Sequence, residues 1–345
     1  MGKPARLGLI SRIQKARKSH LVSYVTSTRP GLEVQMAMDA IRRIYDHISP
    51  WTPDGTKVPR IDLFLYSNGG EGIVPWRLVT LLREHAKEFC VLVPFRAFSA
   101  ATLTALGADH IIMHPMAMLG PTDPTVGNQF NPPDPANPTR RLGISVEDVT
   151  AYIALIRDDA GIQHEEEVVQ AFAKLADKVH PLALGNVKRS LSQSRMMAKK
   201  LLSLHMHPTE DEHRIDEIVD KFTSKLFYHG HPINRGEARE QLELATVEYP
   251  PLPVEKAMWQ LYLDYENEMK LEQPFAPASD FLAAFPDLAP NEPKTTPPAS
   301  ARLAFIESTT RTDVFSLEYE LSGQKAADGS TNVSNIKRRE GWATE

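Results

Sequence analysis

The chain has 345 residues, of which 42% are hydrophobic and 24% are charged, as in an ordinary soluble globular protein. Its formal net charge of −5 argues against a nucleic-acid-binding protein, and its single cysteine, Cys90, excludes an intramolecular disulfide and a cysteine-built metal site. The sequence contains no run of about 18 apolar residues that would predict membrane insertion. We therefore expect a soluble, cytoplasmic protein.

The first part of the chain alternates strand patterns with helix patterns. After a basic amphipathic stretch at 7–18, β-branched and aromatic runs predict strands, and apolar residues three and four apart predict helices. In chain order we expect a strand at 20–26, a helix at about 33–47, a strand at 61–66, a helix at about 73–88, a strand at 91–95, a helix at 100–106 and a strand at 110–113. This alternation favours a parallel sheet with right-handed crossovers, an α/β fold.

Helices dominate the second part of the chain. A surface loop rich in proline and asparagine at 127–138, which could act as a lid, precedes them. We expect helices at 146–159, 164–179, 187–205, 211–227, 235–244 and 254–269. The proline content then predicts a linker at 272–300, followed by a β-hairpin at 301–322 and a disordered tail at 323–345.

Two turns, each between a strand pattern and a helix pattern, carry the strongest functional signal: Ser67-Asn68-Gly69-Gly70 and Ala97-Phe98-Ser99-Ala100-Ala101. A serine attacks a carbonyl usefully only when a base takes its proton and N–H groups receive the developing negative charge. Ser99 is therefore a candidate nucleophile, and the backbone N–H groups of Gly70 and Ala100 are candidate donors of an oxyanion hole. Taken alone, Ser99 would be a helix cap and Gly69-Gly70 a plain turn.

At these turns the chain resembles the Clp-fold serine peptidases, in which a Gly-Gly turn precedes the nucleophilic serine by a unit of similar length. The closer resemblance is to the serine dehydrogenase proteinase family, over about residues 15–270, and is carried by the segments at 97–109 and 117–124. It implies a ClpP/crotonase-like α/β fold. We accordingly divide the chain into a basic segment at 1–19, a core at 20–185 and a helical extension at 186–271.

The resemblance also implies the function. A member of this family is expected to be a serine-type endopeptidase that cleaves a peptide or an unfolded protein and assembles into a homo-oligomer. No metal, nucleotide, flavin or other cofactor is implied, and no nucleic-acid partner. The chain departs from the family pattern at Ser67-Asn68, where Thr-Pro is commoner, and at Ala100-Ala101, where glycines are usual.

The family's proposed triad of Ser, Asp and His, in that chain order, carries over to Ser99, Asp123 and His229. In the Clp peptidase subunit the base comes from the segment that holds Asp123 here, but the corresponding position falls near Pro121. The base must therefore come from elsewhere. The resemblance favours His229, with His231 as the alternative base and Asp123 as the group that orients it.

Several other interpretations remain open from the residues. Asp123 could be a turn residue before Pro124, and a lysine could replace the histidine base, with Lys174 and Lys178 as the conceivable ones. The whole protein could instead be a non-catalytic Clp-fold scaffold that binds an extended peptide by strand addition, or an acyl-CoA enzyme of the crotonase branch. A metal site could draw on His205, His207, His213, His229 and His231.

Overall fold

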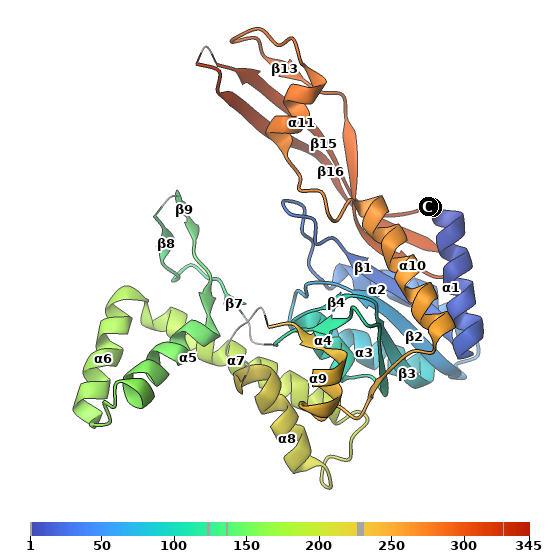
Figure 1. The fold of residues 1–345 in the computed structure, drawn as a ribbon, viewed down its shortest axis with the longest axis vertical. Coiled ribbons are helices and arrows are strands. Elements are labelled where there is room, and N and C mark those ends of the chain that lie inside the picture. The colour runs from blue at the N-terminus through green and yellow to red at the C-terminus, as the bar shows by residue number, and fades with distance from the viewer. Residues whose placement is uncertain (1, 123–124, 136, 226–230, 327) are drawn as a thin grey trace.

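The computed structural model describes residues 2–122, 125–135, 137–225, 231–326 and 328–345. Nine strands form one large sheet, in which β12, β5, β3, β2, β1, β14, β15 and β13 follow one another and β16 pairs with β15 (Figure 1). Within the described ranges no helix combines the length and the apolar character needed to span a membrane.

One half of this sheet is parallel, as the alternating pattern predicts. Its strands pair in parallel register, for example Val22 with Leu63 and Leu63 with Val91. They are β1 (His20–Thr26), β2 (Val58–Tyr66), β3 (Ala86–Val93), β5 (His110–Met113) and β12 (Val247–Glu248). The predicted α/β class is confirmed.

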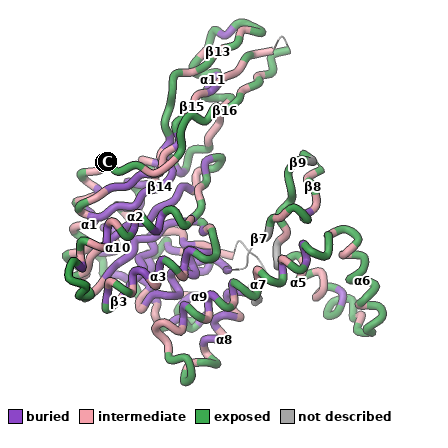
Figure 2. Tube along the Cα trace, turned by 180° about the vertical axis from the view of Figure 1, so that it is seen from behind, coloured by how far each residue is buried: buried purple, intermediate pink, exposed green. Residues whose placement is uncertain are grey.

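Helices cover both faces of the parallel half, because its strands are apolar on both sides. Val22 and Tyr24 of β1 belong to the core on one face, and Leu21 and Val25 belong to the core on the other. The first face is covered by α2 (Asp39–Ile48), α3 (Val74–His85), α4 (Ala100–Leu106), α7 (Pro181–Leu202) and α8 (Glu212–Asp220). The second is covered by α1 (Lys3–Arg17) and α10 (Leu252–Met269). The buried sheet lies between these two layers in Figure 2.

The helix predicted at 73–88 ends earlier than expected. It stops at His85, and Ala86 is extended, with ψ of 150°. From there the chain is β3, which pairs with β2 from Val58 and Ala86 onward. Pairing with a neighbouring strand therefore outweighs the helical periodicity of these residues.

The C-terminal region is more ordered than predicted. An antiparallel meander continues the sheet, consisting of β14 (Ala299–Glu307), β15 (Thr312–Lys325) and β16 (Thr331–Thr344), with the short β13 (Lys294–Thr295) and α11 (Pro277–Ala284) beside it. The expected disordered tail at 323–345 is wrong, since most of it is β16. This strand is largely exposed and polar, but it pairs with β15 along its whole length, so backbone hydrogen bonds hold it in place.

The expected core at 20–185 also differs from the observed body. The sheet takes β12 and β14 from beyond residue 185, and α1 from before residue 20 packs on it. Conversely, an arm within 125–185 stands away from the sheet in Figures 1 and 2. It consists of β7 (Thr125–Val126), β8 (Pro133–Asp134), β9 (Asn137–Arg141), β10 (Ile144–Ser145), α5 (Val146–Ala154), a π-helical turn (Leu155–Asp159) and α6 (Glu165–Lys178).

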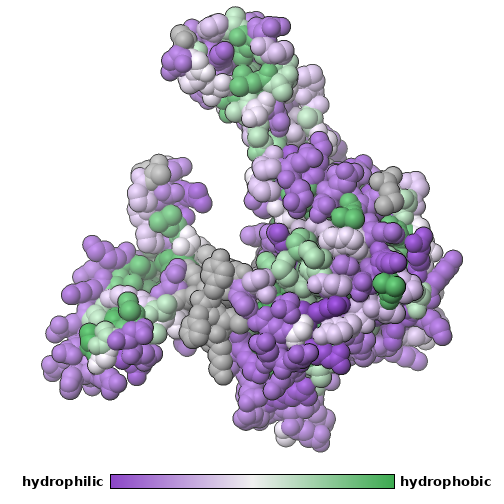
Figure 3. Space-filling model, in the orientation of Figure 1, coloured by the Kyte–Doolittle hydropathy of each residue, from purple (hydrophilic) through white to green (hydrophobic). Residues whose placement is uncertain are grey.

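This arm exposes apolar side chains, as the space-filling view in Figure 3 also shows. Leu155, Val169, Phe172 and Leu182 are between 46% and 60% exposed. An apolar groove of about 670 Å³ lies between α5, α6 and the start of α7. The arm therefore presents an apolar surface outside the main core.

Candidate active site

The two turns singled out in the sequence lie against each other. The Ser67 N–H donates to the Arg96 carbonyl over 3.1 Å, and the Phe98 N–H donates to the Ser67 carbonyl over 3.0 Å. These bonds extend β2 alongside β4 (Arg96–Ala97). The Gly-Gly turn and Ser99 are thereby held side by side.

Glycine is required at both positions of the Gly-Gly turn. A Cβ on Gly69 would lie 2.8 Å from the Ser99 Cβ and 2.7 Å from the Phe98 carbonyl oxygen, and Gly69 has φ of +100°. A Cβ on Gly70 would lie 2.2 Å from the Met36 carbonyl oxygen. The backbone of Met36 clamps this turn, because its N–H donates to the Gly69 carbonyl and its carbonyl accepts from the Glu71 N–H. Any side chain here would push the turn away from Ser99.

Ser67, which departs from the family pattern, organises the same turn. Its hydroxyl accepts the Gly69 N–H at 3.0 Å and the Thr26 hydroxyl at 2.8 Å. These hydrogen bonds are buried, since Ser67 and Thr26 are no more than 1% exposed. Sequence reasoning missed this role, because the partner Thr26 comes from a strand about 40 residues earlier.

Ser99 has an unusual backbone conformation. Its φ of 51° and ψ of −114° lie in a region that favours glycine. It directly precedes α4, but its side chain forms no capping hydrogen bond, so the helix-cap interpretation is wrong. To the residues that the structure describes, its hydroxyl forms no hydrogen bond. The strained turn leaves the hydroxyl available for another partner.

A cavity of about 220 Å³ opens beside Ser99. It is lined by Gly70, Gly72, Ser99, Ala100, Leu103, Thr122, Ser190, Gln193 and Ser194. Neither the Gly70 N–H nor the Ala100 N–H donates to an acceptor within the described part of the chain. Both candidate oxyanion donors thus border the same cavity as the candidate nucleophile.

Buried hydroxyls fix the walls of this cavity. Thr102 of α4 donates to the Ala97 carbonyl over 2.7 Å and accepts the Gly120 N–H at 3.1 Å. These hydrogen bonds tie α4 to β4 and to the chain segment at Gly120. On the other side, the Ser194 hydroxyl of α7 donates to the Thr122 carbonyl over 2.5 Å. Neither Thr102 nor Ser194 stood out in the sequence, because each acts through contacts that are remote along the chain.

A second, three-stranded sheet includes β4, the strand that precedes Ser99. In it β4 pairs in parallel with β6 (Met118–Leu119), and β6 pairs antiparallel with β11 (Ile233–Asn234). β4 and β6 therefore end on the side of the sheet from which β11 starts. On that side Ser99 follows β4, Gly120 follows β6 and Pro232 precedes β11.

Two of the predicted residues, Asp123 and His229, lie outside the described residues. The alternative base, His231, is described: its Nε2 lies 2.7 Å from a carboxylate oxygen of Glu237 in α9 (Arg235–Glu240), and it does not line the cavity. Lys174 and Lys178 are exposed on α6 in the arm, away from Ser99.

Neither Cys90 nor His205 lines the Ser99 cavity, and each is held by the residues around it. The Cys90 thiol is buried, and burial raises its pKa well above the usual range. His205 contacts the Leu106 carbonyl through Nε2 at 2.8 Å, at the end of α4. Among the residues that the structure describes, no three histidine, cysteine or acidic side chains converge as metal ligands would.

These features define a ClpP-like α/β fold with a serine at a strained turn. A family model described as "ClpP-like SDH-type serine proteinase" matches residues 5–206, more than half of the chain. The chain therefore belongs to this family, which confirms the resemblance found in the sequence.

Similar proteins add little on function. The chain is 28% identical over 211 residues to the uncharacterized protein MJ1495 of Methanocaldococcus jannaschii, covering 60% of this chain and 63% of the relative. It is 29% identical over 199 residues to the uncharacterized protein MJ0137 of the same organism, covering 57% and 65%. The chain thus spans less than two thirds of the length of either relative.

The chain is also similar to two solved structures, both of mutants of the 1510-N membrane-bound stomatin-specific protease. One, in complex with a substrate peptide, has a TM-score of 0.37 and 15% identity, covering 62% of this chain and 70% of that one. The other has a TM-score of 0.26 and 19% identity, covering 40% and 63%.

Proposed function

We propose that the chain is a serine peptidase that cleaves peptide bonds through an acyl-enzyme on Ser99. The observation that carries this proposal is the uncapped Ser99 hydroxyl. It shares one cavity with the N–H groups of Gly70 and Ala100, neither of which donates to an acceptor among the described residues. A nucleophile at a strained turn beside preorganised donors is the arrangement that acyl transfer needs. Membership of a serine proteinase family supports the same chemistry.

In the proposed reaction the Ser99 Oγ attacks the peptide carbonyl carbon while a base removes the hydroxyl proton. The carbonyl oxygen becomes an oxyanion, which accepts hydrogen bonds from the Gly70 and Ala100 N–H groups. The C–N bond then breaks, the base returns its proton to the leaving amine, and an acyl-enzyme ester forms. A water molecule, deprotonated by the same base, hydrolyses this ester and regenerates Ser99.

We assign His229 as the base and Asp123 as its orienting acid. The pairing of β6 with β11 supports this assignment. Asp123 comes four residues after Leu119, and His229 comes four residues before Ile233, the partner of Leu119 in the small sheet. The alternative is that His231 is the base, already oriented by Glu237.

We further propose a peptide or unfolded protein as the substrate, a cytoplasmic location and a homo-oligomeric assembly. The apolar groove of the arm supports the assembly, because exposed apolar patches of this kind mark contact surfaces between proteins. Sedimentation analysis of the whole chain, with Phe172→Asp as the variant, tests this part: a dissociated variant is expected, and an unchanged one contradicts it.

A non-catalytic peptide-binding scaffold is the second candidate. The observation in its favour is that no ionisable side chain lines the Ser99 cavity within the described residues. The two candidates differ in one measurable property, the nucleophilicity of Ser99, because only a peptidase needs an activated hydroxyl.

A fluorophosphonate probe tests this property directly, because it forms a bond from the Ser99 Oγ to phosphorus and releases fluoride. We expect the wild type to be labelled and Ser99→Ala not to be, with mass spectrometry locating the adduct. His229→Ala is expected to slow labelling at least about 100-fold, the usual size of a general-base contribution, and His231→Ala to have little effect. Labelling of neither protein, or of both equally, would favour the scaffold.

A further inference from the structure

One wall of the Ser99 cavity comes from α7, which lies outside both turns. Ser190, Gln193 and Ser194 of this helix line the cavity, and their spacing of three and four residues puts them on one helix face. Ser194 is 8% exposed, and its hydroxyl is committed to the Thr122 carbonyl. The wall is therefore fixed at Ser194, whereas Gln193 is exposed and lies at the solvent side.

The size and polarity of the cavity limit what can enter it. Its volume of about 220 Å³ is below the roughly 300 to 1,000 Å³ of pockets that enclose drug-sized ligands. None of the described residues that line it carries a charge, and α7 contributes only hydroxyl and amide groups. The cavity is therefore sized for the side chain of one residue, and a charged side chain would find no partner of opposite charge on this wall.

We propose that the α7 wall is the subsite for the side chain of the residue whose carbonyl is attacked, and that it selects an uncharged residue over a charged one. This inference rests on the proposed function of Ser99. A carbonyl held between the Ser99 Oγ and the two N–H donors has its own side chain next to it, and this cavity is the space that borders all three groups.

Gln193 is the specificity-determining residue of this subsite. Its amide forms no hydrogen bond to the residues that the structure describes, so it can donate to or accept from a polar substrate group. Replacing it changes both the size and the charge of the wall without altering Ser99, Gly70 or Ala100.

Peptidyl diphenyl phosphonates that differ only in the side chain at this position test the proposal. In each, the Ser99 Oγ bonds to phosphorus, a P–O bond breaks and phenol leaves with the proton. We expect the wild type to react at least about 10-fold faster with the alanine probe than with the lysine probe, because the ammonium group would lose water without gaining a partner. Gln193→Glu should reduce this ratio about 10-fold, because it places a negative charge on the wall, and Gln193→Lys should increase it by a similar factor.

The control is Ser192→Ala, an exposed residue of the same helix whose hydroxyl donates to the Lys188 carbonyl and which does not line the cavity. This variant should keep the wild-type preferences. If fluorophosphonate labels Ser99 but the side-chain preference is absent, or is unchanged in both Gln193 variants, the subsite proposal is overturned and the peptidase proposal stands. If fluorophosphonate does not label Ser99, both proposals fail.

Discussion

The backbone of Ser99 stores strain that its side chain does not relieve. A non-glycine residue with positive φ in this region costs on the order of 1 to 3 kcal/mol, and such residues persist where the surrounding structure enforces them. Here the enforcing contacts are the close approach of Gly69 and the hydrogen bonds of Ser67 and Phe98. The strain holds the hydroxyl away from the capping position.

This strain predicts an inversion of the usual stability order of glycine and alanine. We expect Ser99→Gly to be more stable than Ser99→Ala by about 1 kcal/mol, because glycine adopts this conformation without a Cβ penalty. Urea denaturation measures the difference. Ser203, which ends α7 with φ of −67°, provides the control: there the glycine variant should not exceed the alanine variant.

Spacing along the sequence was sufficient to predict that Gly69-Gly70 and Ser99 belong together, because both turns follow neighbouring strands of one parallel sheet. The residues that support them could not be predicted in this way. Ser67, Thr102 and Ser194 act through hydroxyl contacts with distant backbone groups, and a lone serine or threonine has no sequence signal for such a contact.

At the scale of elements, α1, α10 and β14 are joined by a buried ionic cluster around Arg6. The Arg6 guanidinium donates to Glu307 of β14 at 2.8 Å and to Asp264 of α10 at 2.9 Å. The Tyr265 hydroxyl donates to Glu307 at 2.6 Å. Burial alone would raise the pKa of Asp264, but hydrogen bonds from Arg6 and from the Gly2 N–H outweigh burial and lower it.

Removal of Arg6 should therefore destabilise the protein strongly. We expect Arg6→Met to lower the free energy of unfolding by about 3 to 5 kcal/mol, because the buried side chains of Glu307 and Asp264 then lose their cationic partner. Arg6→Met combined with Glu307→Gln should recover part of the loss. In chemical denaturation, Arg42→Ala serves as the comparison, since the exposed Arg42–Asp46 pair should contribute less than about 1 kcal/mol. A small effect of Arg6→Met would contradict this role.

Element prediction succeeded where side-chain periodicity decides the structure and failed where pairing decides it. The helix expected at 254–269 matches α10 closely, since its apolar face covers the sheet. β16 was missed because its residues are polar and exposed, and its strand conformation comes from its pairing with β15. The order of the strands, with β14 next to β1, involves contacts between the two ends of the chain that no local pattern encodes.

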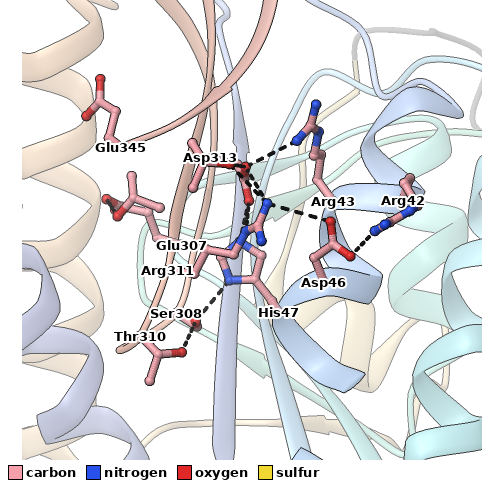
Figure 4. Close-up of polar contacts among 12 residues, drawn as sticks. Arg42, Arg43, Asp46, His47, Glu307, Ser308, Thr310, Arg311, Asp313 and Glu345 are labelled. Carbon is pink, nitrogen blue, oxygen red and sulfur yellow. Dashed lines mark hydrogen bonds and ion pairs between the residues drawn. The ribbon is translucent and has the colours of Figure 1, made fainter. Parts of the chain in front are cut away.

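At the scale of the whole molecule, a buried cluster connects α2 to the β14–β15 turn (Figure 4). His47 contacts Asp313 through Nε2 at 3.0 Å and Ser308 through Nδ1 at 2.9 Å. Arg311 pairs with the same Asp313 carboxylate at 2.5 Å, and Arg43 approaches it at 3.7 Å. His47, Ser308 and Asp313 are at most 1% exposed, so this serine, histidine and aspartate cannot meet a substrate and act as a structural connection.

This cluster predicts how stability depends on pH. Burial lowers the pKa of His47 to about 4, against the opposing effect of Asp313, whose charge Arg311 already balances. The unfolded chain takes up this proton near its ordinary pKa of about 6.5. The neutral imidazole therefore stabilises the protein fully above about pH 6.5. As the pH falls towards 4 this contribution is lost, and the free energy of unfolding decreases by up to about 3 kcal/mol.

The variant His47→Gln isolates this contribution, because glutamine can still donate to Asp313 but does not titrate. Thermal unfolding between pH 7 and pH 4 should show a shallower loss of stability in the variant than in the wild type. His114 and His205 also have pKa values lowered by burial, so the stability of both proteins still decreases to some extent as the pH falls. Parallel curves for the two proteins would refute the role of His47.

The position of β1 between β2 and β14 has a consequence for the order of synthesis. On the ribosome, β1 and β2 emerge early, whereas β14 follows only after residue 298. Until then one edge of β1, an apolar strand, has no partner within the nascent chain, and such edges readily pair with other chains. Premature termination before β14 would therefore release an aggregation-prone fragment, and this fold depends on translation continuing past residue 298.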